Sequence, residues 1–70
     1  MMILWMKKWD NGERRVYATA IQLSKRKQKI IIQFVELDNG KEKVKDKKIY
    51  TMWDEYSKTM VREWLNKGSN

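Results

Sequence analysis

An apolar run at residues 29–37 limits the choice of fold, because three consecutive isoleucines lead into Gln33, Phe34 and Val35. β-Branched and aromatic side chains favour a pleated, buried strand, and nine residues are few for a helix. An Asp-Asn-Gly triplet follows directly, and its residues tolerate the positive φ that a tight hairpin requires. The run therefore predicts a central strand that turns back into a neighbour. Since it is apolar on both faces, both faces need cover.

A first strand is predicted at residues 3–9, where alternation places Ile3, Trp5 and Trp9 on one face. It ends at a second Asp-Asn-Gly triplet, residues 10–12. Because the same triplet closes the central strand, two similar hairpins are predicted.

The second strand is predicted at residues 14–23. Its alternation places Val16, Ala18 and Ala20 on one face and Tyr17 on the other. Small alanine side chains allow another element to approach closely, so this face is predicted to receive a helix.

The fourth strand is predicted at residues 41–50, which are almost wholly charged. Alternation places Lys43, Lys47 and Ile49 on one face and Val44 on the other. Lysines of this kind bind a ligand or protect an edge strand from aggregation, and the pattern is compatible with both.

A basic run at residues 24–29 joins the second strand to the central one and carries four positive charges with no acid. It is predicted at the rim of the sheet opposite the two Asp-Asn-Gly turns. A solvated loop tip has the same composition, but in so basic a chain the run favours binding.

A helix is predicted to follow, with Thr51 as its N-cap and acids in its first turn in the manner of a capping box. It runs to about Lys67, and Gly68 is a suitable αL cap. Large side chains recur at helical spacing, with Val61 and Leu65 beside them. A stripe of this kind is predicted to be mainly core, but four large side chains together with Val61 and Leu65 exceed what one thin sheet buries. Part of the stripe is therefore also the predicted dimer interface: Trp53, Tyr56, Met60 and Trp64.

The predicted fold class is α+β, a four-stranded antiparallel meander followed by one C-terminal amphipathic helix, in a single domain over residues 1–70. A core of this size leaves little net stability. With no Cys and no His, the chain lacks disulfides, thiolate zinc sites and the commonest metal ligand. We expect no metal and no cofactor, and we expect a homodimer to supply extra burial.

Sixteen Lys and Arg against nine Asp and Glu give a net charge of +7, which favours a polyanionic partner, most often nucleic acid. Aromatic side chains stack on the bases of single strands while lysines follow the backbone. The candidate nucleic-acid-binding residues are Trp5, Trp9, Arg14, Tyr17, Lys25, Arg26, Lys27, Lys29, Lys43 and Lys47.

Catalysis is not predicted. The chain has no His or Cys for nucleophilic catalysis. Its carboxylates are scattered among lysines, and it contains no Gly-rich phosphate loop. The apolar opening at residues 1–6 has its lysines after it, the reverse of a signal peptide, and no stretch approaches a membrane span. We therefore expect a cytoplasmic protein.

Residues 29–56 resemble the transcriptional positive-cofactor-four coactivator family and its bacterial and phage relatives. The pattern of a lysine, aliphatics, an acid, a Gly turn, a basic segment and an aromatic in the helix falls on Lys29, Ile30, Ile32, Glu36, Gly40, Lys43, Lys47, Ile49 and Tyr56. Val35 replaces a basic residue of the family, Val44 and Lys45 replace its Pro-Gly pair, and Lys48 replaces a Gly. The resemblance implies a homodimer that packs its helices together and binds single-stranded DNA on its sheets.

The leading hypothesis is therefore a homodimeric binder of single-stranded nucleic acid, DNA rather than RNA, with little sequence preference. One alternative is a small Src-homology-three-like or chromo-like barrel that binds duplex DNA. Another is a phage-type inhibitor or adaptor that binds an acidic host protein. Duplex binding favours the first alternative, and recovery of one protein partner without oligonucleotide binding favours the second.

Overall fold

A computed structural model describes residues 1–67 and has the predicted element order, four strands followed by one helix. The elements are β1 (Met2–Asp10), β2 (Arg14–Ser24), β3 (Lys27–Asp38), β4 (Lys41–Tyr50) and α1 (Glu55–Lys67). All neighbouring strands pair antiparallel in the order β1-β2-β3-β4. The α+β meander is confirmed.

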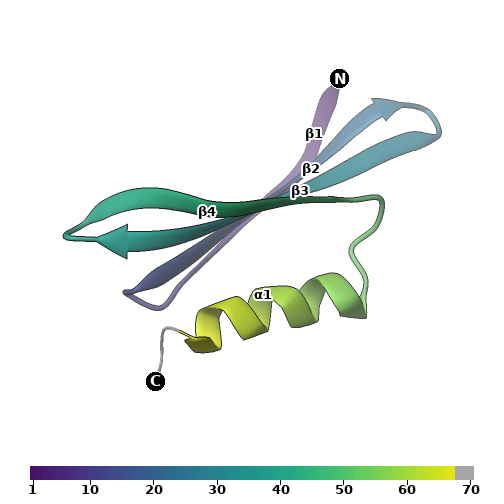
Figure 1. Ribbon diagram of the computed structural model, residues 1–70. Helices are drawn as coiled ribbons and strands as arrows, with labels where there is room; N and C mark the ends of the chain where they lie inside the picture. Colours follow the sequence, from purple (N-terminus) through teal and green to yellow (C-terminus); the bar gives the residue numbers. More distant parts are fainter. Residues whose placement is uncertain (68–70) are drawn as a thin grey trace.

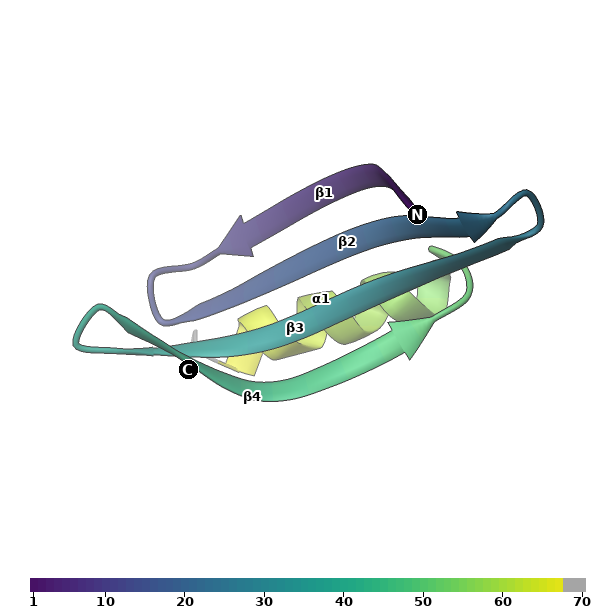
Figure 2. The ribbon, with the colours of Figure 1, turned by 90° about the horizontal axis from the view of Figure 1, so that it is seen from above.

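The sheet is open and strongly twisted, and α1 lies against one face of it (Figure 1). From above, the four strands lie over the helix, and nothing else in the described chain covers the near face (Figure 2). We call the two sides the helix face and the open face. Because β1 and β4 do not pair with each other, the four strands of the described chain form an open sheet.

The hydrophobic core lies between β2, β3 and α1. Ala18 and Ala20 are buried on β2 and allow the helix to come close, so the predicted role of the alanines is confirmed. The full cluster is Val16, Ala18, Ala20, Ile30, Ile32, Phe34 and Val61. Each aliphatic side chain taken fully out of water contributes about 1.5–3 kcal/mol, so this small cluster supplies most of the burial available to the fold.

The two Asp-Asn-Gly triplets form hairpins of different kinds. In the second, Asn39 (φ 53°) and Gly40 (φ 81°) both have positive φ, as a two-residue type I′ turn requires. In the first, only Gly12 does, with φ 91°. There Asn11 Oδ1 accepts hydrogen bonds from the backbone N–H groups of Glu13 and Arg14, which makes a longer loop. Both turns lie where the sequence predicts them, but the prediction that the two hairpins are similar is wrong.

Two register shifts move side chains between the faces. The shift between Ile3 and Trp5 pairs Ile3 with Ile21 on the open face, so Ile3 does not share a face with the tryptophans as predicted. The shift opposite Phe34 and Val35 has the same effect in β4, where residues before and after the shift do not follow one alternation between the faces. Single-strand alternation fails at both places because each shift adds an unpaired residue.

In β4, Lys43 pairs with Glu36 on the helix face, whereas Lys47 pairs with Gln33 on the open face. The prediction that these two lysines share a face is therefore wrong. Val44, predicted on the opposite face from Lys47, lies on the same face.

The helix begins three residues later than a cap at Thr51 implies. The true N-cap is Asp54, because its Oδ1 accepts hydrogen bonds from the Ser57 backbone N–H at 2.9 Å and from the Ser57 hydroxyl at 3.1 Å. The backbone N–H of Ser57 also holds the pKa of Asp54 below its ordinary value. Thr51 lies in the bend before the helix, and the Gly68 cap lies outside the described residues.

Most of the predicted aromatic stripe packs within the monomer. Trp53, Met60 and Trp64 contact the core cluster, and Trp64 Nε1 donates a hydrogen bond to the Val35 carbonyl at 3.3 Å. Tyr56 is 63% exposed. Three of the four residues predicted at a dimer interface therefore pack against the core of the same chain, and the fourth, Tyr56, contacts the Tyr50 ring edge-on. Within residues 1–67, no helix is long and apolar enough to cross a membrane.

Candidate nucleic-acid interface

The predicted stacking residues lie on two different faces of the sheet. Trp5 and Trp9 pair with Ala20 and Val16, so they project to the helix face and pack against the core there. Tyr17 lies on the open face. The three candidate stacking residues therefore do not share one face, and the helix and the segment before it partly cover the tryptophans.

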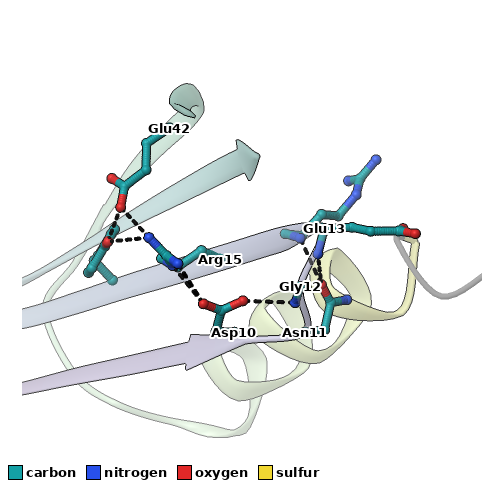
Figure 3. A network of polar contacts seen from close by, with 8 residues as sticks. Asp10, Asn11, Gly12, Glu13, Arg15 and Glu42 are labelled. Atoms are coloured by element: carbon teal, nitrogen blue, oxygen red, sulfur yellow. Dashed lines mark hydrogen bonds and ion pairs between the residues drawn. The ribbon is translucent and has the colours of Figure 1, made fainter. Parts of the chain in front are cut away.

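Tyr17 belongs to a polar network on the open face, of which Figure 3 labels Asp10, Arg15 and Glu42. Its hydroxyl donates a hydrogen bond to Glu42, and Arg15 contacts both Glu42 and Asp10. Arg15 and Tyr17 on β2 reach Glu42 on β4 across the intervening strand β3. Their side chains pass over Val35, which lies on the open face but has no exposed surface. The hydroxyl of Tyr17 is therefore fixed by two charged neighbours.

The same network sets the ionisation of its carboxylates. The hydrogen bond from Tyr17, aided by Arg15, holds the pKa of Glu42 below its ordinary value. The backbone N–H of Gly12 and the side chain of Arg15 do the same to the pKa of Asp10. The two carboxylates in turn raise the pKa of the Arg15 guanidinium, together with Tyr17. Asp10, Arg15 and Glu42 are therefore all charged at neutral pH, and we call these three residues the clamp.

The basic run forms the hairpin between β2 and β3. Lys25 and Arg26 are its turn. Lys27, predicted in the loop, belongs to β3, as does Lys29, where the central strand was predicted to begin. No ion pair joins any of these side chains to an acid within residues 1–67. A hollow of about 380 Å³ lies beside the tip and is lined by Leu23, Arg26, Lys27, Gln28, Lys29 and Thr51.

A second hollow, of about 270 Å³, lies between the edge strand β1 and α1. Trp9 and Trp53 stack in its wall with ring centroids 5.6 Å apart and planes 14° apart. The hollow is lined by Lys7, Trp9, Trp53, Lys58, Val61, Arg62 and Leu65. We call it the tryptophan hollow. It combines aromatic surface with three cations.

The cations of the tryptophan hollow are held close to its rings. Lys7 Nζ lies 5.1 Å from the ring centroid of Trp5 and 5.6 Å from that of Trp53, within cation–π range. Lys58 pairs with Glu55 at 3.2 Å. Arg62 donates to the Thr59 hydroxyl at 3.3 Å and has no ion pair to an acid in the described chain. Two of the three charges are therefore not neutralised by a salt bridge.

The remaining predicted residues are scattered. Arg14 lies on the helix face with its guanidinium carbon 4.2 Å from the Trp64 ring centroid, and it pairs with Glu36 at 3.8 Å. It therefore has a structural role between sheet and helix. Lys43 and Lys47, as noted, lie on opposite faces and do not meet in one site.

Sequence reasoning missed Lys7, Lys58 and Arg62. A signal existed for each, since Lys7 lies midway between Trp5 and Trp9 on one strand face, and Lys58 and Arg62 are four residues apart on one helix face. What the sequence did not show was that β1 and α1 lie next to each other.

No group of three His, Cys, Asp or Glu able to hold a metal ion occurs among residues 1–67. No family model, no curated protein and no solved structure matches this chain. The resemblance to the positive-cofactor-four family therefore stays a prediction.

Proposed function

We propose that this protein binds single-stranded nucleic acid, DNA in preference to RNA, without a catalytic role and with little sequence preference. The observation that carries the proposal is the stacked pair Trp9 and Trp53 in a hollow bordered by Lys7, Lys58 and Arg62. The proposed site differs in location from the sequence-based hypothesis, because it lies between β1 and α1.

The chemistry of the tryptophan hollow suits a single strand better than a duplex. An unpaired base has a free π face, and stacking on an aromatic side chain contributes about 1–3 kcal/mol per base. Cations beside the rings neutralise the adjoining phosphates and release counterions. A duplex hides its base faces, so it has only the electrostatic part of this attraction.

The basic hairpin extends the same surface. Thr51 lines the hollow at the hairpin tip and Trp53 lines the tryptophan hollow. The two residues are separated by one position, so their Cα atoms lie at most about 7 Å apart. A strand with bases at Trp53 is therefore near Arg26 at the hairpin tip, whereas Lys27 and Lys29 belong to the open face of β3.

The proposal includes a homodimer and a cytoplasmic location. The small core and the uncovered face of the sheet favour the dimer, because a sheet apolar on both sides gains stability when the second side is covered. The cytoplasmic location rests on the sequence features given above.

The test is a tryptophan-fluorescence titration with oligothymidine and with a duplex of equal length, at low and moderate salt. Three of the four tryptophans lie at or beside the hollow, so we expect strong quenching by the single strand. Affinity falls with salt by about 0.7 log units per log unit for each phosphate neutralised on a single strand. Absence of quenching by either ligand would contradict the proposal and favour a protein partner with an acidic surface. Tighter binding of the duplex would contradict the single-strand preference.

Paired variants locate the site. Lys7→Gln with Arg62→Gln removes two charges from the tryptophan hollow, and Lys41→Gln with Lys45→Gln removes two from β4. We expect the first pair to weaken binding at least tenfold and to reduce the salt slope by about 1.4. The second pair is expected to change affinity less than threefold. An equal loss in both pairs would mean that net charge alone attracts the oligonucleotide.

A further inference from the structure

The open face of the sheet carries a row of uncharged side chains that crosses all four strands. Pairing places Met6 beside Thr19, Thr19 beside Ile31, and Ile31 beside Ile49. Met6 is 69% exposed and Ile49 57% exposed. We call these four the apolar row. Nothing else in residues 1–67 packs over it (Figure 2).

The next row continues this apolar surface on β1 and β2, and carries Lys29 on β3. Ile3 pairs with Ile21, and Ile3 is 57% exposed. Scattered exposed apolar residues are normal, but a contiguous patch of this kind marks an interaction site.

The chemistry of the face favours another sheet over a nucleic acid. Among the described residues on the open face, the one aromatic side chain is Tyr17, whose hydroxyl is bound to Glu42. Aliphatic and β-branched side chains offer no ring for a base to stack on. They interdigitate well with similar side chains on a second sheet about 10 Å away.

We infer that a second copy of this chain covers the open face, with the two-fold axis along the apolar row. The inference deepens the proposed dimer and does not depend on nucleic-acid binding. In this arrangement each residue of the row lies opposite the same residue of the other copy, as an isologous interface requires. The strands of the two sheets run in opposite directions, and the two tryptophan hollows face outward on opposite sides of the dimer.

The charges of the open face support this orientation. Lys27 lies four residues before Ile31 on β3, and Val35 lies four residues after it, each about 13 Å from the row. A two-fold axis along the row therefore places Lys27 opposite the position of Val35 in the second copy, where Asp10 and Glu42 flank Arg15. Turning the axis parallel to the strands would instead place the basic hairpin of one copy against the basic hairpin of the other.

The available area is at the lower end of what a specific dimer needs. Four strands about 4.8 Å apart and nine positions along each give a flat projection of about 500 Å². The corrugated side-chain surface exceeds this projection and approaches the roughly 800 Å² per partner of a standard interface. We therefore expect a reversible dimer whose population rises with concentration.

Analytical ultracentrifugation without nucleic acid tests the interface. The parent chain is expected to reach twice the mass of 8.6 kDa at high concentration. Met6→Glu and Ile49→Glu, each tested alone, are expected to raise the dimer dissociation constant at least tenfold. Tyr56→Glu, at an exposed position on the helix side, is the matched control and is expected to leave the dimer unchanged. A parent chain that stays monomeric, or a dimer lost in Tyr56→Glu and kept in Met6→Glu, would overturn the inference.

A zero-length carbodiimide cross-link tests the orientation. Lys27 and Glu42 lie at opposite ends of one sheet, so a bond between them forms only across two copies. We expect a Lys27–Glu42 or Lys27–Asp10 peptide in the dimer band. A dimer band whose links join other pairs, with none of these, would overturn the proposed axis. The fluorescence titration of Met6→Glu then separates the two proposals, since its tryptophan hollow remains intact whether or not it dimerises.

Discussion

Trp9 stacks on Trp53 with the two ring planes 14° apart, and this contact ties the edge strand β1 to the segment that leads into α1. Trp5 meets the same ring of Trp53 edge-on, with centroids 5.6 Å apart. Aromatic pairs contribute about 0.5–1.5 kcal/mol beyond their burial. Trp53 therefore holds together two elements that have no other large contact, and it forms the wall of the candidate site.

Replacing Trp53 by Ala is expected to lower the free energy of unfolding by about 3 kcal/mol, because two ring contacts and a large half-buried side chain are lost. Urea denaturation followed by far-ultraviolet circular dichroism measures the change. Met52→Ala, next to it and 56% exposed, is the control and is expected to stay within about 0.5 kcal/mol of the parent. Equal stability of parent and Trp53→Ala would contradict the role assigned to this ring.

Tyr50→Phe is expected to leave the protein as stable as the parent or up to about 1 kcal/mol more stable. The Tyr50 hydroxyl is buried and has no hydrogen-bond partner among the described residues, and burial raises its pKa. An unsatisfied buried polar group costs about 1–3 kcal/mol, which the substitution removes while the ring contact with Tyr56 remains. The control is Tyr17→Phe, which removes a hydroxyl that does donate a hydrogen bond, and thermal denaturation compares the two. A clear loss of stability in Tyr50→Phe would show that this hydroxyl has a partner.

The strands and the helix were predictable because each has its own strong local signal. The isoleucine run of β3 and the alternation of β2 with its alanines depend on burial patterns that neighbouring residues already encode. The Asn-Gly turn at residues 39–40 likewise requires positive φ at both positions.

The faces of β1 and β4 were harder to predict, because each register shift depends on the partner strand. Nothing in residues 3–9 marks the shift that separates Ile3 from Trp5. The same limit applies to the candidate site. Lys7 and Arg62 are 55 positions apart in the sequence, and only the packing of α1 against the sheet brings them to one hollow.

Asp54→Ala is expected to destabilise the helix, whereas Thr51→Ala is expected to have no effect. Asp54 accepts hydrogen bonds from both the N–H and the hydroxyl of Ser57, so its loss leaves a first-turn N–H and the fully buried Ser57 hydroxyl with fewer partners. Helical ellipticity and the thermal midpoint of both variants measure the difference. Asp54→Asn, which keeps a capping oxygen, is expected to recover most of the loss. A larger effect of Thr51→Ala would return the cap to the position that the sequence alone suggests.

The clamp of Asp10, Arg15 and Glu42 predicts how stability changes in acid. The pKa values of both carboxyls are lowered in the folded protein from ordinary values of 3.8 for Asp10 and 4.5 for Glu42. A lowered pKa in the folded state means that the unfolded chain takes up protons first. The stabilisation is therefore fully present above about pH 5 and is lost as the pH falls through 4.5 toward the lowered values.

Glu42→Gln removes one of these carboxylates, so it is expected to be less stable than the parent at pH 7 and to approach the parent as the pH falls below 4. Urea midpoints at half-unit steps from pH 7 to pH 2.5 measure this convergence. Tyr17→Phe removes the hydrogen bond that contributes most to the lowered pKa of Glu42, so its loss of stability in acid is expected to be smaller than in the parent and to be complete at a higher pH. Parallel curves of urea midpoint against pH for the parent and Glu42→Gln would show that the charge of Glu42 does not stabilise the fold. The polar network over Val35 would then cover that side chain without adding stability through this charge.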